Sequence, residues 1–392
     1  MTDVAERLEE LRDRGLHRRL RLVEGPQGPQ VQLEGQQVTL LCSNNYLGLA
    51  DHPKVRGAAA EAAMRWGAGA GASRLVSGNM EPHRQLEARL AGFKGYEAAL
   101  LFGSGYLANT GAVAALAGRG EVVFSDELNH ASIVDGCRLS RAETFVYRHA
   151  DLEHLAWGLE QAGGRGALIV SDGIFSMDGD VAPLPGLVEL ARRHGCRLLI
   201  DEAHATGAIG PGGRGTVAAA GLGDEVDVVI GTLGKALGSY GAYACASAET
   251  VDFLLNAARP FVFSTAPPPP SVAAATAALE LVTRQRVERL QENAARFRAA
   301  LAAEGLDAGR SQTQIVPLEV GAAEPTMALC ERLLARGVFA QGIRPPTVPE
   351  GSSRLRFTVM ASHRAAELEG AAKLVGAAAR EAGFLTPSAV AA

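Results

Sequence analysis

Seven short apolar runs alternate with helical segments between residues 98 and 247, and this alternation constrains the fold more than any other feature of the chain. The runs are AALLF, EVVFSD, ETFVY, ALIVSD, CRLLIDEA, VDVVIG and AYACAS, and amphipathic stretches such as LPGLVELARRHG lie between several of them. Strands that are apolar along their whole length are buried on both faces, and the intervening helices supply the cover. The pattern predicts an α/β domain built on a mostly parallel, seven-stranded sheet.

Polar residues follow several of these runs directly. SD comes after ALIV, DEAH after LLI, and GTLGK after VVI. In a mostly parallel sheet these positions share the carboxyl edge, where ligands bind in such folds. We therefore expect the functional site at this edge.

The segments before and after the predicted sheet indicate further helices. Val4, Leu8 and Leu11 recur at helical spacing in MTDVAERLEELRDRG, so we expect an amphipathic helix that packs on the body of the protein. Beyond the sheet, the proline-rich STAPPPP interrupts the chain, and we expect one long helix after it, capped by Ser271 and reaching about residue 303.

Three more strand-like runs, QIVPLEV, VFAQGI and RLRFTV, lie in the C-terminal part. The expected domains are an N-terminal helix with short strands at 1–45, a large domain at 46–270 and a smaller α+β domain at 271–392.

Composition narrows the classes of function. The chain is 47% hydrophobic and 21% charged with a formal net charge of -5, which is typical of a soluble globular protein and argues against a nucleic-acid partner. The charged N-terminus is no signal peptide, and no apolar run approaches the ~18 residues of a membrane span, so we expect a cytoplasmic protein. The five cysteines never stand in CxxC spacing, which favours reduced thiols over disulfides or a structural metal site. They are Cys42, Cys137, Cys196, Cys245 and Cys330.

Lys235 lies in the glycine-flanked GTLGKALG and could bind phosphate, form a covalent bond with a cofactor, or be a solvated loop residue. A P-loop needs Ser or Thr directly after its lysine, and Ala236 stands there instead. The DEAH motif at 201–204 has the letters of a helicase box, but without a P-loop it gives no motor.

A nucleotide-binding alternative depends on GSGYLA at 103–108, which imitates a dinucleotide fingerprint at a helix start. Such a site needs an acidic residue about 20 positions further on to hold a ribose, and Asp126 lies near that position. The same geometry serves any phosphate. This motif alone does not decide between the two.

A covalent lysine suits pyridoxal 5'-phosphate, which also needs a phosphate cradle, an acid at the pyridine nitrogen, a ring-stacking partner and a clamp for the substrate carboxylate. Each of these residues taken alone also fits a plain structural role, such as a helix cap or a core histidine. Gly105 and Tyr106 are the candidates for the phosphate cradle, and Asp201 is the candidate for the acid at the pyridine nitrogen. His130 could stack on the ring, and His204 lies three residues after Asp201. Arg356 is the candidate for the carboxylate clamp.

The order of these residues and six longer blocks carry a resemblance over nearly the whole chain. The blocks are CSNNYLGLADHP, SDELNHASIVDGCRLS, DGIFSMDGDVAPLP, DEAHATGAIGPGGRGT, GTLGKALG and IRPPTVPEGSSRLRFT. With them the chain resembles the α-oxoamine synthases, which join an amino acid to an acyl thioester with loss of CO2. The resemblance implies a fold-type I pyridoxal-phosphate transferase, similar to aspartate aminotransferase, with a smaller α+β C-terminal domain.

The resemblance also implies roles for individual residues. Lys235 would hold the cofactor and act as base and acid, and Asp201 would keep the pyridine nitrogen protonated. The remaining contacts with the cofactor would come from Gly105, Tyr106, His130, Ser176, His204 and Thr232, with Ser264 and Thr265 reaching the phosphate of a partner subunit in a homodimer. The substrates would meet Arg356 and Asn44 at the amino-acid carboxylate, His130 over the cofactor ring, Arg18 at the far end of the acyl chain, and Thr347 in the acyl channel.

Two blocks bear on the substrates within this family. GDVAPLP and IRPPTVPEG favour the members that join L-alanine to a pimeloyl thioester of CoA or of acyl carrier protein. LNHASIVDGCRL and GTLGKALG also fit members that join glycine to acetyl-CoA, which are the alternative. The local pattern also leaves open which of Arg18, Arg19 and Arg21 meets the acyl carboxylate. No membrane partner is expected.

Overall fold

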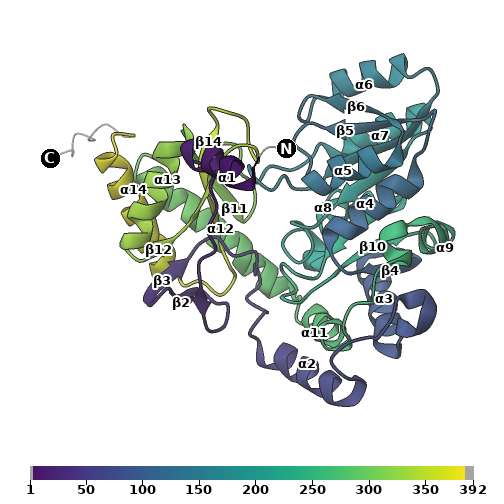
Figure 1. Ribbon diagram of the computed structural model, residues 1–392, viewed down its shortest axis with the longest axis horizontal. Coiled ribbons are helices and arrows are strands. Elements are labelled where there is room, and N and C mark those ends of the chain that lie inside the picture. The colour runs from purple at the N-terminus through teal and green to yellow at the C-terminus, as the bar shows by residue number, and fades with distance from the viewer. Residues whose placement is uncertain (1–2, 385–392) are drawn as a thin grey trace. The chain divides into compact units, whose positions relative to one another are not determined.

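A computed structural model describes residues 3–384, which fold into two compact units (Figure 1). The sheet unit consists of residues 49–176 and 180–288. The terminal unit consists of the described residues 3–48, 177–179 and 289–384. The expected N-terminal region and most of the expected C-terminal domain therefore lie in one unit.

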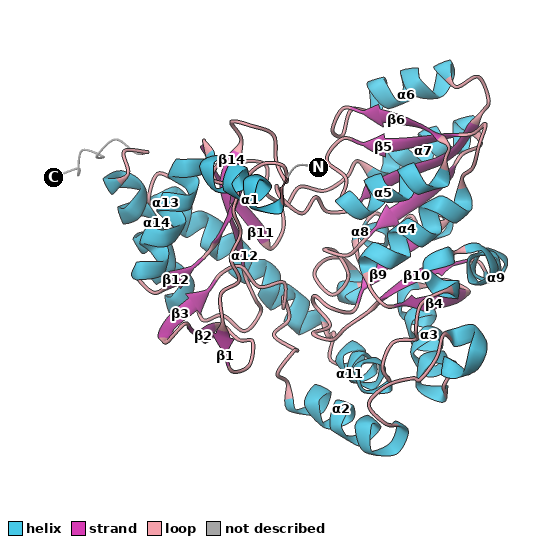
Figure 2. Cartoon of the chain, viewed as in Figure 1, coloured by secondary structure: helices cyan, strands magenta, loops and turns pink. Residues whose placement is uncertain are grey.

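The sheet unit contains the predicted seven-stranded sheet, which is confirmed and mostly parallel (Figure 2). Its spatial order is β4-β10-β9-β8-β7-β5-β6, and only β10 runs antiparallel to its two neighbours. The strands are β4 (Ala98–Phe102), β5 (Val122–Asp126), β6 (Glu143–Tyr147), β7 (Gly166–Asp172), β8 (Arg197–Asp201), β9 (Val228–Thr232) and β10 (Ala242–Ala246).

Helices cover both faces of this sheet, as the continuous apolar strands require. Successive residues of a strand alternate between the faces, so Val123 packs into one core and Phe124 into the other. The helices and turns of this unit are α2 (Pro53–Trp66), η1 (Arg74–Gly78), α3 (Glu81–Lys94), α4 (Gly105–Leu116), α5 (Ala131–Ser140), α6 (Leu152–Gln161), α7 (Leu184–His194), η2 (Pro211–Gly213), α8 (Thr216–Ala219), η3 (Gly223–Glu225), α9 (Ala248–Ala257), α10 (Arg259–Val262) and α11 (Pro269–Glu280).

Helix α7 shows how the sequence defines an element here. Its buried side chains Leu187, Leu190 and Ala191 recur at helical spacing and pack under the sheet. Gly195 ends it in the left-handed region at φ 65°, a conformation that glycine adopts without steric cost. The chain then enters β8, whose apolar residues are buried.

The terminal unit contains two smaller sheets. One has the order β1-β2-β3-β12, in which β12 pairs parallel with β3 and so joins the two ends of the chain in one unit. The other has the order β11-β14-β13 and is antiparallel. The elements are α1 (Val4–Asp13), β1 (Val23–Glu24), β2 (Gln30–Leu33), β3 (Gln36–Leu40), β11 (Ile315–Gly321), α13 (Ala323–Ala335), β12 (Val338–Phe339), β13 (Gln341–Ile343), β14 (Ser353–Thr358) and α14 (Ala365–Glu381).

The single long helix expected after the prolines is wrong. The segment forms α11 and a second helix, α12 (Arg284–Ala303), which begins in the sheet unit and continues into the terminal unit. Thr283 precedes α12 and its hydroxyl accepts a hydrogen bond from the Arg286 amide, which is the capping contact that starts a new helix. Ser271 is no cap, because α11 already begins within the proline run, where a missing N–H has no cost.

The N-terminal helix exists, but its expected packing on the body is wrong for the described residues. None of α1 is buried, and Val4 is 80% exposed. The helix is mostly charged, and its narrow apolar stripe gives little driving force for docking.

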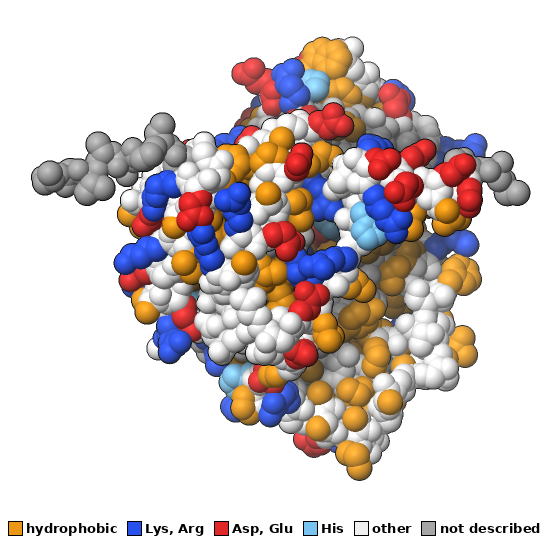
Figure 3. Space-filling model, turned by 60° about the vertical axis from the view of Figure 1, so that its left-hand side comes forward, with side chains coloured by type: hydrophobic (Ala, Val, Ile, Leu, Met, Phe, Trp, Pro, Cys, Tyr) orange, Lys and Arg blue, Asp and Glu red, His pale blue; other side chains and the backbone are white. Residues whose placement is uncertain are grey.

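Four of the five cysteines are buried, and none of the five is joined in a disulfide in this structure. Among residues 3–384, no helix is long and apolar enough to cross a membrane. Figure 3 shows acidic and basic side chains intermixed on the surface in view rather than gathered into one basic face.

Candidate active site

The carboxyl edge of the sheet carries a row of polar residues, where the sequence places the site. Asp126, Asp172, Asp201 and Thr232 are the last residues of β5, β7, β8 and β9, which run in one direction. Asp172 and Asp201 are register partners on neighbouring strands. Two carboxyl groups are thereby placed side by side in the interior.

Asp201 is 5% exposed and accepts two N–H hydrogen bonds. The side-chain amide of Asn109 donates to Oδ2 over 2.6 Å, and the backbone amide of Ala203 donates to Oδ1 over 2.7 Å. The two donors supply the hydrogen bonds that a buried carboxyl group requires. Asn109 lies one turn after Gly105, the first residue of α4, so the start of this helix lies beside the end of β8.

Asn109 also connects Asp201 to His130. The Asn109 amide donates to the Ser132 hydroxyl over 2.9 Å, and that hydroxyl lies 2.7 Å from His130 Nδ1. His130 precedes α5 as its N-cap, and its ring accepts the Ser132 amide. These contacts fix the orientation of the imidazole that the sequence predicts to lie over a cofactor ring.

Surrounding protein removes water from His130 and lowers the pKa of its imidazole, while Asp201 opposes this effect and the charge of Lys235 adds to it. The neutral ring that results is suited to stacking. The dependence on both charges also shows that His130, Asp201 and Lys235 lie close together.

Asp172 belongs to the SD that follows ALIV, and its sequence position predicted this edge of the sheet but no specific role. Burial raises the pKa of its carboxyl group well above the ordinary value, and the Asp201 charge raises it further. Its Oδ2 accepts the backbone amide of His130 over 3.0 Å. Asp172 therefore holds the backbone of His130 in place beside Asp201.

Lys235 and His204 are in contact, with 2.7 Å between Nζ and Nε2. His204 is buried and Lys235 is half-buried. The loop around Lys235 is tightly built. Gly238 has φ 59°, and a side chain there would clash with the backbone of Ala50.

The remaining cofactor candidates lie at several places in the sheet unit. Gly105 and Tyr106 begin α4, and Ser104 caps that helix by accepting the Leu107 amide over 3.2 Å. Thr232 ends β9, next to the end of β8. Ser176 is buried in a turn that the Phe175 amide closes onto the Asp180 carbonyl. Ser264 and Thr265 lie in the segment before α11, and Thr265 bridges to Ser73.

Asp126, which a dinucleotide site would need for a ribose, is occupied by other contacts. It is 2% exposed, and its two oxygens accept the amides of Leu128 and Ala150 over 2.9 and 2.8 Å. His149 lies 3.1 Å from one of them and 2.7 Å from Asp180 on its other side. A ribose would have to break this network, so the nucleotide-binding alternative loses its main support.

In the terminal unit, Arg356 on β14 lies with Asn44 and a residue that the sequence did not single out, Tyr46. The Tyr46 hydroxyl donates to Asn44 Oδ1 over 3.0 Å. Burial raises the pKa of Tyr46, while the charge of Arg356 opposes this rise. Arg356 is 7% exposed and reaches this cluster from the strand.

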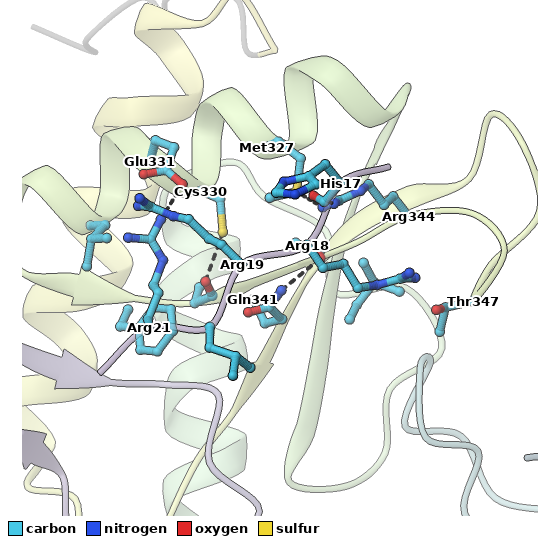
Figure 4. Close-up of a pocket in the computed structure, with 16 residues that line it drawn as sticks. His17, Arg18, Arg19, Arg21, Met327, Cys330, Glu331, Gln341, Arg344 and Thr347 are labelled. Atoms are coloured by element: carbon cyan, nitrogen blue, oxygen red, sulfur yellow. Dashed lines mark hydrogen bonds and ion pairs between the residues drawn. The ribbon is translucent and has the colours of Figure 1, made fainter. Parts of the chain in front are cut away.

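A cavity of about 510 Å³ in the terminal unit is lined by both acyl-site candidates, Arg18 and Thr347 (Figure 4). Arg21 forms ion pairs with Glu34 and Glu331, and Arg19 lies 3.9 Å from Glu34. Figure 4 shows Arg19 and Arg21 on the side of Glu331, whereas Arg18 extends toward Thr347. Of the three arginines, Arg18 is the one without a described carboxylate partner.

The chain is similar to known proteins in sequence and in structure. The family model described as aminotransferase class I and II matches residues 36–375. The 8-amino-7-oxononanoate synthase of Citrifermentans bemidjiense is 54% identical over 390 residues, covering 98% of this chain and 100% of that protein. The synthase of the same name from Geobacter sulfurreducens is 55% identical over 387 residues, covering 97% and 99%.

Solved structures show the same fold. A serine palmitoyltransferase variant from S. paucimobilis, with a bound adduct of PLP and myriocin, has a TM-score of 0.92 and 33% identity, covering 97% of this chain and 98% of that chain. An 8-amino-7-oxononanoate synthase from Francisella tularensis has a TM-score of 0.77 and 24% identity, covering 89% and 99%, and this likeness bears on the fold alone.

Proposed function

The chain belongs to the aminotransferase class I and II family, and we propose that it condenses L-alanine with a pimeloyl thioester, giving 8-amino-7-oxononanoate, CO2 and the free thiol in biotin synthesis. The observation that carries this proposal is the identity of 54–55% over nearly the whole chain with enzymes named 8-amino-7-oxononanoate synthase. Fold and site chemistry agree with it.

The residues of the sheet unit fit pyridoxal phosphate. A lysine amine lies beside a histidine, a buried carboxylate lies where it can face a protonated ring nitrogen, and a helix begins one turn from that carboxylate. Lys235 would hold the aldehyde carbon, Asp201 the ring nitrogen, and Gly105 and Tyr106 the phosphate. His130 would lie over the ring, with Ser176, His204 and Thr232 as further hydrogen-bond partners.

When bound, pyridoxal phosphate supplies an electron sink for the substrate carbon that loses its proton. The Lys235 amine takes the proton from Cα of alanine and returns one to the same carbon after CO2 has left. His204 holds the amine between these two steps, because it lies 2.7 Å from Nζ. Asp201 keeps a proton on the ring nitrogen, supported by the hydrogen bond from Asn109.

Substrate selection is assigned to residues of the terminal unit. Arg356 binds the alanine carboxylate through its two-pronged guanidinium group, and Asn44 assists. Tyr46 keeps Asn44 in place through its hydroxyl. Arg18 meets the far carboxylate of the acyl chain, and Thr347 lines the channel beside it.

The active form is proposed to be a homodimer in which Ser264 and Thr265 contact the cofactor phosphate of the partner subunit. Large apolar side chains of the same unit are exposed in the single chain, and burial of such side chains against a second subunit would be favourable. Met64 is 90% exposed, Val76 80% and Phe263 71%. Phe263 directly precedes the two proposed phosphate contacts.

Thiol release tests the proposed function. L-alanine and glycine are each combined with pimeloyl-CoA and acetyl-CoA, and the initial rates of the four mixtures are compared. The proposal requires the highest kcat/KM with L-alanine and pimeloyl-CoA. Preference for glycine and acetyl-CoA would instead make the chain a glycine C-acetyltransferase, and no thiol release in any mixture would refute both.

A further inference from the structure

The cavity of the terminal unit carries an excess of positive charge. Its lining contains four arginines and His17, against one carboxylate, Glu331. Arg21 forms ion pairs with Glu331 and Glu34, and Arg19 lies 3.9 Å from Glu34. Two guanidinium groups, those of Arg18 and Arg344, are left without an acidic partner among residues 3–384.

Arg344 follows β13 and is the buried member of this pair, with 9% of its surface exposed. Nη2 donates to the His17 carbonyl over 2.8 Å, and Nη1 lies 3.0 Å from the Met327 sulfur, a weak acceptor. Nε is buried and has no hydrogen-bond partner among the described residues. A buried arginine that is held by one carbonyl and one thioether is poorly compensated in the free protein.

Arg18 lies close enough to act on Arg344. Burial lowers the pKa of Arg344, and the charge of Arg18 lowers it further. Two like charges that face one cavity repel each other until an anion enters. A carboxylate offsets both charges and supplies the acceptors that Arg344 lacks, and a guanidinium binds it in a planar, two-pronged contact.

We propose that Arg344 is a specificity-determining residue that binds, together with Arg18, the terminal carboxylate of a dicarboxylic acyl chain in this cavity. This inference rests on the proposed function and names the group that separates a pimeloyl donor from a monocarboxylic one. Arg344 supplies the desolvated contact at the cavity wall, and Arg18 the more accessible one. The pairing of Arg19 and Arg21 with acidic side chains explains why those two arginines do not compete for the ligand.

The test measures kcat/KM for two acyl donors of equal chain length at saturating L-alanine. Pimeloyl-CoA carries the terminal carboxylate, and heptanoyl-CoA lacks it. Arg344→Met keeps an unbranched side chain of similar length and removes the charge. Arg332→Met makes the same change at an exposed position of α13 outside the cavity. Arg344→Lys keeps the charge and removes the planar fork. The loaded wild type and all variants are also compared by thermal unfolding.

We expect Arg344→Met to lower kcat/KM for pimeloyl-CoA roughly 10- to 100-fold, the range for one hydrogen bond to a charged group, and to change heptanoyl-CoA by less than about threefold. Arg344→Lys gives a smaller loss for pimeloyl-CoA, and Arg332→Met changes neither donor. Equal losses with both donors, or an unchanged preference for pimeloyl-CoA, would overturn the assignment. Should Arg344→Met fail to fold, an unchanged preference in Arg344→Lys overturns it. Absence of turnover with either donor in the wild type would refute the proposed function instead.

Discussion

Asn109 donates a 2.6 Å hydrogen bond to Asp201, and so joins the first turns of α4 to the end of β8. The same amide reaches Ser132, which in turn contacts His130. One asparagine therefore aligns the proposed acid at the ring nitrogen with the proposed stacking histidine. Asp201, Asn109, Ser132 and His130 thereby form one connected network.

Replacing Asn109 should weaken this alignment without removing any group that contacts substrate. We expect Asn109→Ala to lower kcat roughly 10- to 100-fold, because Asp201 loses a charge-assisted hydrogen bond in the interior. The effect should appear in kcat more than in KM for either substrate. Asn256→Ala, on the exposed part of α9, is the control, and equal activity of the two variants would argue against the positioning role.

Lys235 should be the only lysine that becomes joined to the cofactor. Borohydride reduction followed by peptide mapping should retain cofactor mass on the peptide with Lys235, and not on peptides with Lys54, Lys94 or Lys373. Lys235→Ala should retain no mass after reduction and should lose about 10³-fold or more in turnover, as expected for loss of the acid–base group. Cofactor mass on another lysine of the wild type would contradict the site.

The Lys94–Glu202 ion pair should matter for stability, because both side chains are almost completely buried. Glu202 also accepts the Thr216 hydroxyl and the Val217 amide over 2.8 Å each. Lys94→Met should lower the free energy of unfolding by roughly 3–5 kcal/mol, since it leaves a buried carboxylate unpaired. The double variant Lys94→Met/Glu202→Gln should lose less than the sum of the single losses in denaturant unfolding. Additive losses would show that the pair does not act as a unit.

His149 should make stability depend on pH. Burial lowers the pKa of this imidazole, but the hydrogen bonds to Asp126 and Asp180 outweigh burial and raise the pKa to about 9 from 6.5. A raised pKa stabilises the fold fully below pH 6.5, and this contribution declines as pH rises through about 9. The gap in unfolding temperature between wild type and His149→Gln should therefore be widest near pH 6.5 and narrow by pH 9.5.

Asp180→Asn removes one of the two carboxylates that face His149 and should reduce this pH dependence. A gap between wild type and His149→Gln that stays constant from pH 6.5 to 9.5 would show that His149 is not charged in the folded protein.

The parts of the fold that local sequence determines were predictable. Continuous apolar strands and intervening helices indicate the sheet. Asp201 ends one of the strands that the pattern identifies, and Lys235 lies shortly after another. The two helices α11 and α12 were missed because a single capping hydroxyl, that of Thr283, separates them within a uniformly helical composition. Exposure of α1 was missed because helical spacing does not show how much apolar area a stripe can bury.

The site residues that were missed depend on tertiary contacts. Asn109 is one polar residue in an otherwise apolar helix, and only the position of β8 gives it a partner. The pKa of Asp172 is raised by burial and by the charge of Asp201 on the adjacent strand, and both causes depend on the folded sheet. Arg344 stands among several basic residues in the sequence, and only its burial beside Met327 distinguishes it.

Decarboxylative condensation is the central claim, and one isotope experiment tests it most directly. L-alanine labelled with ¹³C at its carboxyl carbon is incubated with pimeloyl-CoA and the enzyme, and CO2, thiol and product mass are measured together. The account predicts that all label leaves as CO2, that one thiol is released per CO2, and that the product is unlabelled 8-amino-7-oxononanoate. Label retained in the product, or thiol release without CO2, would contradict it.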